Sequence, residues 1–210
     1  MQSFSLVPLL VVISTVLGIL VLKRFLQLLP YMAQSYFHAR GNFAIENSIR
    51  VRQDRNLVAL VLIVPVVLVV NRFDLYNPAF VQEMSPNLHL LSVAGVLSGY
   101  VLLRQLMYVW SRPQRQRGDS YSQAHWLGYT YFVFLALLLL VTAGILVLVK
   151  APFSLSRLIL WLETGLVFLV FLFRFTQILS LSCNPLRTFL YLCGLEILPA
   201  SLLVISALVL

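Results

Sequence analysis

Charged residues are scarce in this chain of 210 residues, where Asp, Glu, Lys and Arg together make up 10%. A soluble domain carries about 25% of such residues, because water must solvate its surface. The chain is 60% hydrophobic and has a mean hydropathy of +0.93, so it has too little polar material to cover a soluble fold. The composition therefore argues against a soluble protein and predicts an integral membrane protein.

Residues and motifs that carry chemistry are also missing. The two cysteines, Cys183 and Cys193, are too few for a disulfide framework, and we expect both to be small packing residues. The three histidines, His38, His89 and His125, fall in predicted loops or at the edge of a span, where they cannot be axial ligands of a membrane haem. No phosphate-binding loop, nucleophile elbow, zinc-protease motif or paired-aspartate motif occurs. We therefore predict no catalytic residue, metal or cofactor, which argues against an enzyme without excluding one.

Long apolar runs are abundant, and they have the length of membrane-spanning helices. A helix needs about 20 residues to cross the hydrocarbon layer, whereas the strands of a membrane barrel alternate over about ten. Because these runs are apolar on every face, we predict an all-α, polytopic membrane helix bundle of about six transmembrane helices that forms one domain, residues 1–210. The second and fifth spans are short, so their complete crossing stays open. The predicted spans are residues 6–22, 57–70, 88–110, 126–149, 158–173 and 189–210.

Basic residues are distributed unevenly between the predicted loops. Six of them, Arg55 included, lie between Lys23 and Asn56, and in all twelve lie at one end of the predicted bundle against three at the other. The positive-inside rule then places the basic loops in the cytoplasm and both termini outside. The net charge of +8 follows from this topology and favours anionic headgroups, so it requires no nucleic-acid partner.

The segment 31–55 mixes aromatic residues with Arg and Gln. This mixture is typical of a helix that lies at the membrane interface, with its rings in the bilayer and its cations toward the headgroups. We predict such an interfacial helix, broken near Gly41 and Asn42. A solvated loop is the alternative interpretation.

Two opposite charges fall inside predicted spans at matching depths. Arg104 lies six residues before Trp110, about 9 Å from the cytoplasmic boundary by helix rise, and Glu196 lies about 10 Å from the same boundary. A charge near the centre of a span costs about 2.5 to 3.5 kcal/mol on insertion scales, and bidentate pairing offsets part of that cost. We therefore predict an ion pair, or shared water, between Arg104 and Glu196. Glu196 is then a strut between two spans, with a functional acid or a protonated carboxyl as alternatives.

Pro199 follows Glu196 by three residues, and proline inside a helix removes a backbone donor and tends to kink it. We predict a kink there, which could open a polar cavity beside the acid or serve packing alone. A second acid, Glu163, lies in the fifth predicted span, about 10 Å away in depth. Glu163 could snorkel outward or reach Arg157 through water. The two acids are too far apart for an acid–base dyad, although they could be two positions on a proton route.

The third predicted span contains the pair Gly95-x-x-x-Gly99, which permits close packing of helices. Because this span also carries Arg104, we expect it to be central in the bundle.

The closing region resembles the signature of a known family. The segment FLYLCGLEILP, preceded by RFTQILSLSCNPLRT, is similar to the carboxy-terminal region of an uncharacterised integral membrane family of Bacteroidetes, catalogued as domain of unknown function 4271. The resemblance implies a bacterial inner-membrane protein and supplies neither a substrate nor a mechanism. The chain departs from the family in stopping directly after the apolar VISALVL, which leaves the exit of the last span open. The matching positions are Leu190, Tyr191, Leu192, Cys193, Leu195, Glu196, Ile197 and Pro199.

Three functions are compatible with these patterns. The first is a non-catalytic structural or assembly subunit of a cell-envelope complex, whose partners are the lipid bilayer and other membrane-protein subunits. The second is a small proton-coupled transporter or carrier that uses Glu196 and Arg104. The third, an enzyme acting on lipid or isoprenoid substrates, is the least favoured, because the motifs for that chemistry are missing. Substrate and oligomeric state do not follow from the sequence.

Overall fold

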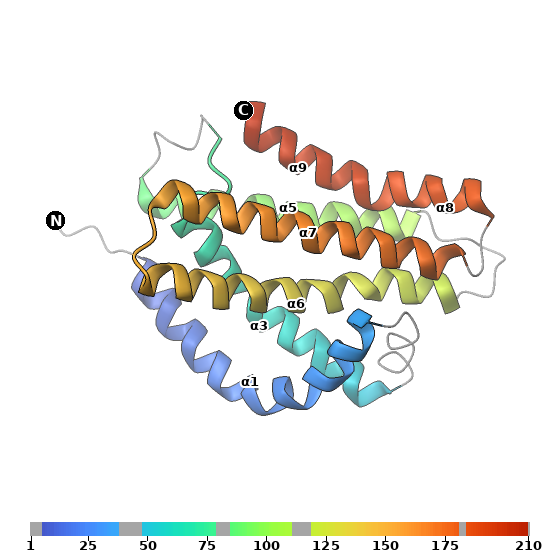
Figure 1. The fold of residues 1–210 in the computed structure, drawn as a ribbon, viewed down its shortest axis with the longest axis horizontal. Helices are drawn as coiled ribbons and strands as arrows, with labels where there is room; N and C mark the ends of the chain where they lie inside the picture. The colour runs from blue at the N-terminus through green and yellow to red at the C-terminus, as the bar shows by residue number, and fades with distance from the viewer. Residues whose placement is uncertain (1–5, 38–47, 79–84, 111–118, 181–183, 210) are drawn as a thin grey trace.

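The computed structural model of the chain describes residues 6–37, 48–78, 85–110, 119–180 and 184–209. This part of the chain is helical, and its long helices run back and forth along the longest axis of the molecule (Figure 1). The last span is divided into two α-helical parts and a π-helical part, named η1, between them. The elements are α1 (Leu6–Phe37), α3 (Ile49–Arg72), α5 (Pro86–Trp110), α6 (Asp119–Leu148), α7 (Phe153–Ser180), α8 (Pro185–Tyr191), η1 (Leu192–Ile197) and α9 (Leu198–Val209).

Within the described residues, six helical stretches are long and apolar enough to cross a membrane. The prediction of an all-α bundle with about six transmembrane helices is therefore confirmed, and the chain is a multi-pass membrane protein by helix length and hydropathy. The second and fifth spans are longer than predicted, since α3 has 24 residues and α7 has 28. The apolar run marks only the part of a helix inside hydrocarbon, whereas the helix continues into polar residues at both ends. The six stretches are Leu6–Gln34, Ile49–Arg72, Pro86–Trp110, Ala124–Leu148, Phe153–Ser180 and Thr188–Ala207.

The most buried spans are α3 and α6, whereas the third span, which the sequence predicts to be central, is much less buried. Helix α6 packs against α3 and α7, and it supplies buried residues to three of the four core clusters in the described structure. A helix that is apolar all round is suited to this buried position, and α6 is the most apolar of the long spans. Helix α5 lies toward one side of the bundle, against α3 and the last span.

The predicted interfacial helix over 31–55 is not a separate helix in the described residues. Its first part, to Phe37, continues α1, which contains Pro30 and changes direction toward its end (Figure 1). Its last part forms the first turns of α3, where Ser48 caps the helix by accepting a hydrogen bond from the amide of Val51. Residues 38–47, with the predicted break at Gly41, lie outside the described residues.

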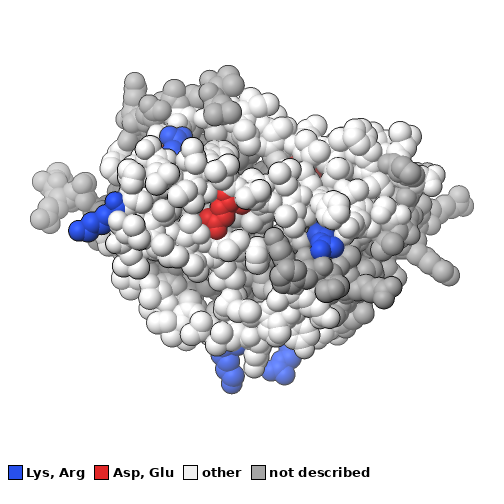
Figure 2. Space-filling model, viewed as in Figure 1, with Lys and Arg blue, Asp and Glu red and all other residues white. Residues whose placement is uncertain are grey.

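Most of the molecular face in Figure 2 is uncharged. Many large apolar side chains are exposed on the helices, Leu20 of α1 and Leu106 of α5 among them. An exposed apolar surface of this kind is what a lipid bilayer covers. We call the end of the bundle where α1, α5 and α7 finish the basic end, because most Lys and Arg residues lie near it in the sequence.

Candidate functional site: a buried ion pair

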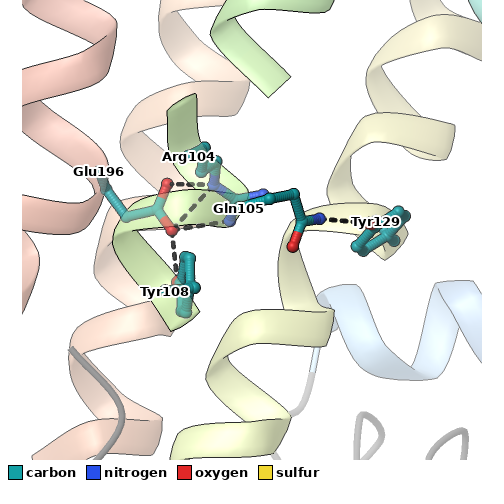
Figure 3. A network of polar contacts seen from close by, with 5 residues as sticks. All are labelled: Arg104, Gln105, Tyr108, Tyr129 and Glu196. Carbon is teal, nitrogen blue, oxygen red and sulfur yellow. Dashed lines mark hydrogen bonds and ion pairs between the residues drawn. The ribbon is translucent and has the colours of Figure 1, made fainter. Parts of the chain in front are cut away.

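The structure brings Arg104 of α5 and Glu196 of η1 into direct contact (Figure 3). The Arg104 Nη2 lies 2.7 Å from the Glu196 Oε1, and the Arg104 Nε donates to both carboxylate oxygens, at 3.2 and 3.0 Å. Glu196 is 1% exposed, and 14% of the Arg104 side chain is exposed. This bidentate geometry is the strongest way for an arginine to bind a carboxylate, and it joins two spans that are 92 residues apart in sequence.

Tyr108 completes the contacts of the carboxylate. Its hydroxyl donates to the Glu196 Oε1 at 2.6 Å, and its ring lies under the Arg104 guanidinium, with 5.2 Å between Cζ and the ring centroid. Tyr108 follows Arg104 by four residues, so both side chains leave the same face of α5. Tyr108 was not among the predicted site residues, although its spacing of four from Arg104 is a usable signal in the sequence.

Gly128 of α6 provides the space that the guanidinium occupies. A Cβ atom at this position would lie 2.8 Å from the Arg104 Cζ and would also collide with both terminal nitrogens. Real Cβ atoms essentially never show contacts this short, so a side chain at this position would require the Arg104 guanidinium to shift from its place beside Glu196. Gly128 was not among the predicted site residues, because nothing in the sequence says which helix faces Arg104.

Glu196 lies in the π-helical segment η1, which ends at Ile197, two residues before Pro199. In η1 the amide of Leu198 bonds to the carbonyl of Cys193, five residues back. Widened π-helical turns are one way in which a helix adapts to a proline, and such a segment lies next to Pro199, where the sequence predicts a kink. Single π-helical turns within α-helices are often found at functional sites.

A second buried cation, Arg55 of α3, lies close to this site. Arg55 is 0% exposed, and it donates to the Asn56 side chain and lies over the rings of Trp126 and Tyr129, at 5.4 and 5.9 Å. Gln105 of α5 in turn donates to the Tyr129 hydroxyl (Figure 3). The prediction that Arg55 belongs to a cytoplasmic loop is wrong, because α3 begins at Ile49 and two aromatic rings of α6 cover the guanidinium.

The imidazole of His125 packs between these groups. Its ring centroid lies 4.3 Å from that of Tyr108 and 5.1 Å from that of Trp126. Its Nδ1 is buried without a hydrogen-bond partner in the part of the chain that the structure describes. The polar groups of α3, α5, α6 and η1 thus form one layer toward the basic end of the bundle.

Glu163 lies apart from this layer. It belongs to α7 and accepts a hydrogen bond from the hydroxyl of Thr142 on α6 at 3.0 Å. The ion pairs among the described residues are Arg24–Asp54 and Arg104–Glu196, so Glu163 does not pair with Arg157 there. The two intramembrane acids are therefore in different surroundings.

Gly95 and Gly99 do not pack closely against another helix of this chain. A Cβ atom at either position would meet nothing within 4 Å among the atoms of the structure, and both residues are exposed. The expected packing is therefore wrong within one copy of the chain. The glycine pair permits a close approach but does not require one.

The remaining candidate groups for metal or redox chemistry are clusters of metal-ligating side chains and the two cysteines. The described residues contain no group of three or more His, Cys, Asp or Glu side chains that could hold a metal ion. Cys193 is a partly buried free thiol in η1, and Cys183 lies outside the described residues. Arg104, Tyr108 and Glu196 form a hydrogen-bonded cluster that joins α5 to η1.

Comparison of the chain with protein-family models, with curated proteins and with solved structures found no match. The resemblance of residues 189–199 to a Bacteroidetes membrane family therefore stays a prediction.

Proposed function

We propose that this chain is a non-catalytic, polytopic protein of a bacterial cytoplasmic membrane, and that it acts as a structural or assembly subunit of a cell-envelope complex. The prediction that its termini are periplasmic belongs to the same proposal. The resemblance of residues 189–199 supports the bacterial membrane, and the uneven distribution of basic residues supports the orientation.

The observation that carries the proposal is that both carboxylate oxygens of Glu196 already have hydrogen-bond partners. Its two oxygens accept three hydrogen bonds from Arg104 and one from Tyr108, and all of these donors come from α5. An acid that transfers protons or binds substrate must present an oxygen to its ligand, whereas these oxygens already have partners inside the protein. Removing one member of a buried pair costs about 3–5 kcal/mol, so such a pair fixes the arrangement of its helices.

The exposed helix surfaces are consistent with a subunit role. Helix α1 is the least buried of the six candidate spans in the described structure and contacts mainly α3. Such a span leaves a wide apolar face for lipid or for a neighbouring protein.

Co-purification tests this proposal. The chain, tagged at one terminus and expressed at its native level, is extracted from its own membranes in a mild detergent and separated by native electrophoresis. We expect a discrete assembly larger than the 23.8 kDa chain, with the same partner subunits after chemical cross-linking in intact membranes. Recovery of the chain alone after cross-linking and in several mild detergents would contradict the proposal.

A second candidate, a proton-coupled carrier, is favoured by one observation. Glu196 lies in a π-helical segment inside a span, and both intramembrane acids and π-helical turns mark many transport sites. Proteoliposomes that contain a pH-sensitive dye distinguish the two functions. A carrier requires the flux of the wild-type chain to fall in Glu196→Gln, whereas equal flux for both chains removes this candidate.

The orientation has its own test. A reporter that fluoresces only in the cytoplasm is fused to either terminus, and one that is active only in the periplasm is fused in parallel. We expect activity only from the periplasmic reporters, and cytoplasmic fluorescence at either end would reverse the topology.

A further inference from the structure

Glu163 lies inside the span formed by α7. It is the eleventh residue of α7, which begins at Phe153, so ten residues of helix place it about 15 Å along the axis from the start of the span. The hydrocarbon layer is about 30 Å thick, and the apolar run of this span begins near Leu158, five residues before Glu163, so Glu163 lies about 7.5 Å inside the layer by helix rise.

Only one of the two carboxyl oxygens of Glu163 has a hydrogen-bond partner among the described residues. Its Oε1 accepts from the Thr142 hydroxyl at 3.0 Å, whereas its Oε2 is buried without a hydrogen-bond partner in the described structure. No basic side chain forms an ion pair with Glu163 among the described residues. Glu196, in contrast, has a cation and a hydroxyl on its oxygens.

The surroundings of Glu163 open toward the outside of the bundle. Leu162 and Leu166, its neighbours on α7, are 59% and 63% exposed, and Val141, beside Thr142 on α6, is 61% exposed. Figure 2 shows acidic atoms reaching the surface over the region of α6 and α7, among uncharged residues. In a membrane this surface contacts lipid chains, so a small apolar reagent dissolved in the bilayer can reach it.

We propose that Glu163 is a proton-binding carboxyl at the lipid-facing seam between α6 and α7, and a modification site for hydrophobic carbodiimides. A carboxylate in hydrocarbon without a cation is strongly destabilised, and binding a proton removes its charge. The same proton turns one oxygen into a donor, and Thr142 continues to serve the other oxygen. This inference does not depend on the proposed subunit role.

The groups that face Glu163 support a neutral acid. Thr142 is the polar residue that α6 contributes, and the nearby core cluster, which includes Phe73, Leu139 and Leu160, is apolar. On α7 itself the nearest charged residue is Arg157, six positions earlier and exposed near the start of the helix. No described titratable group at ion-pair distance competes for the proton.

The reaction of such a carboxyl with a carbodiimide is an addition. The protonated acid gives its proton to one nitrogen, and the carboxyl oxygen forms a bond to the central carbon. The resulting O-acylisourea rearranges to an N-acylurea when water is excluded, and no group leaves. The modified residue therefore gains the full mass of one reagent molecule.

The experiment uses the full chain in native membranes and in lipid nanodiscs. Each sample is treated with dicyclohexylcarbodiimide near neutral pH, digested and analysed by mass spectrometry. We expect at least about tenfold more modification at Glu163 than at Glu196, because burial and pairing with Arg104 protect the latter. A water-soluble cationic carbodiimide should instead leave Glu163 unmodified and react with acids outside the spans, such as Asp74.

Two controls keep the inference falsifiable. Glu163→Gln should lose the modification while its elution in size-exclusion chromatography stays that of the wild-type chain. Raising the pH should reduce labelling of Glu163, since only the protonated acid adds to the reagent. The proposal is overturned if Glu163 stays unmodified in nanodiscs, if Glu196 reacts equally, or if only the water-soluble reagent modifies Glu163. Protection in native membranes but not in nanodiscs would also overturn it, because a partner's cation would then occupy the carboxylate.

Discussion

The two acids inside the membrane, Glu196 and Glu163, differ in almost every contact. Glu196 is 1% exposed and receives four hydrogen bonds from Arg104 and Tyr108. Glu163 receives one hydrogen bond, from Thr142, and lies where the seam of two helices opens outward. We propose that the same side chain is an anchor between helices in one place and a proton-binding carboxyl in the other. The difference teaches that the partners of an intramembrane acid decide its role more than its depth does.

The largest effect should come from removing the anchored acid. Glu196→Leu keeps the volume of the side chain but leaves the Arg104 guanidinium buried without its counter-charge. We expect the free energy of unfolding to fall by about 3–5 kcal/mol. Reversible unfolding in mixed micelles, followed by tryptophan fluorescence, measures this change. An unchanged free energy would mean that the ion pair contributes nothing to the bundle.

A substitution at Gly128 of α6 fills the space beside the Arg104 guanidinium while leaving both Arg104 and Glu196 unchanged. Gly128→Ala places a methyl group against the terminal atoms of Arg104, and we expect a loss of about 1–3 kcal/mol from overpacking. The matched control is Gly95→Ala, where the added methyl meets open space. That variant should be unchanged or gain up to about 1 kcal/mol, because alanine is the better helix former. Equal effects of the two variants would refute the fit between Gly128 and Arg104.

The hydroxyl of Tyr108 should matter less than either charge. Tyr108→Phe removes one donor from a carboxylate that keeps Arg104, so we expect a loss of about 1–2 kcal/mol. Tyr76→Phe removes a neutral hydrogen bond to Ser206 at the opposite end of the bundle, and its loss should be about 0.5–1 kcal/mol. Unfolding midpoints of the two variants in the same detergent test the order, and a larger effect at Tyr76 would be inconsistent with it.

The smallest effect is expected at the other acid. Glu163→Leu removes a buried oxygen that has no partner, and Thr142 can turn its hydroxyl to its own helix, as Thr164 and Thr176 do. The free energy of unfolding should change by less than about 1 kcal/mol in either direction. A loss as large as that of Glu196→Leu would show that Glu163 is also an anchor.

The contact between Arg104 and Glu196 could be anticipated because a helix rises by a fixed amount per residue, which converts sequence position into depth. Two charges at one depth in an apolar medium have few other partners. The roles of Tyr108 and Gly128 could not be anticipated in the same way. They depend on which helix faces which, and that follows from the packing of the whole bundle.

The wrong predictions share a physical origin. Gly95 and Gly99 allow a close helix contact, but in this chain their face of α5 is turned outward. Arg55 was counted with the loop cations because hydropathy treats arginine as solvated, whereas the rings of Trp126 and Tyr129 and the side chain of Asn56 accommodate it. Periodicity and composition describe one segment at a time, and these features arise between segments.

The central claim is that Arg104 and Glu196 hold α5 and the last span together as a pair. A double-mutant cycle with Arg104→Met, Glu196→Leu and the combined variant measures their coupling directly. We predict that the double variant recovers at least about 2 kcal/mol relative to the sum of the single losses, because it leaves no unpaired charge. Losses that add to within about 0.5 kcal/mol would contradict the claim.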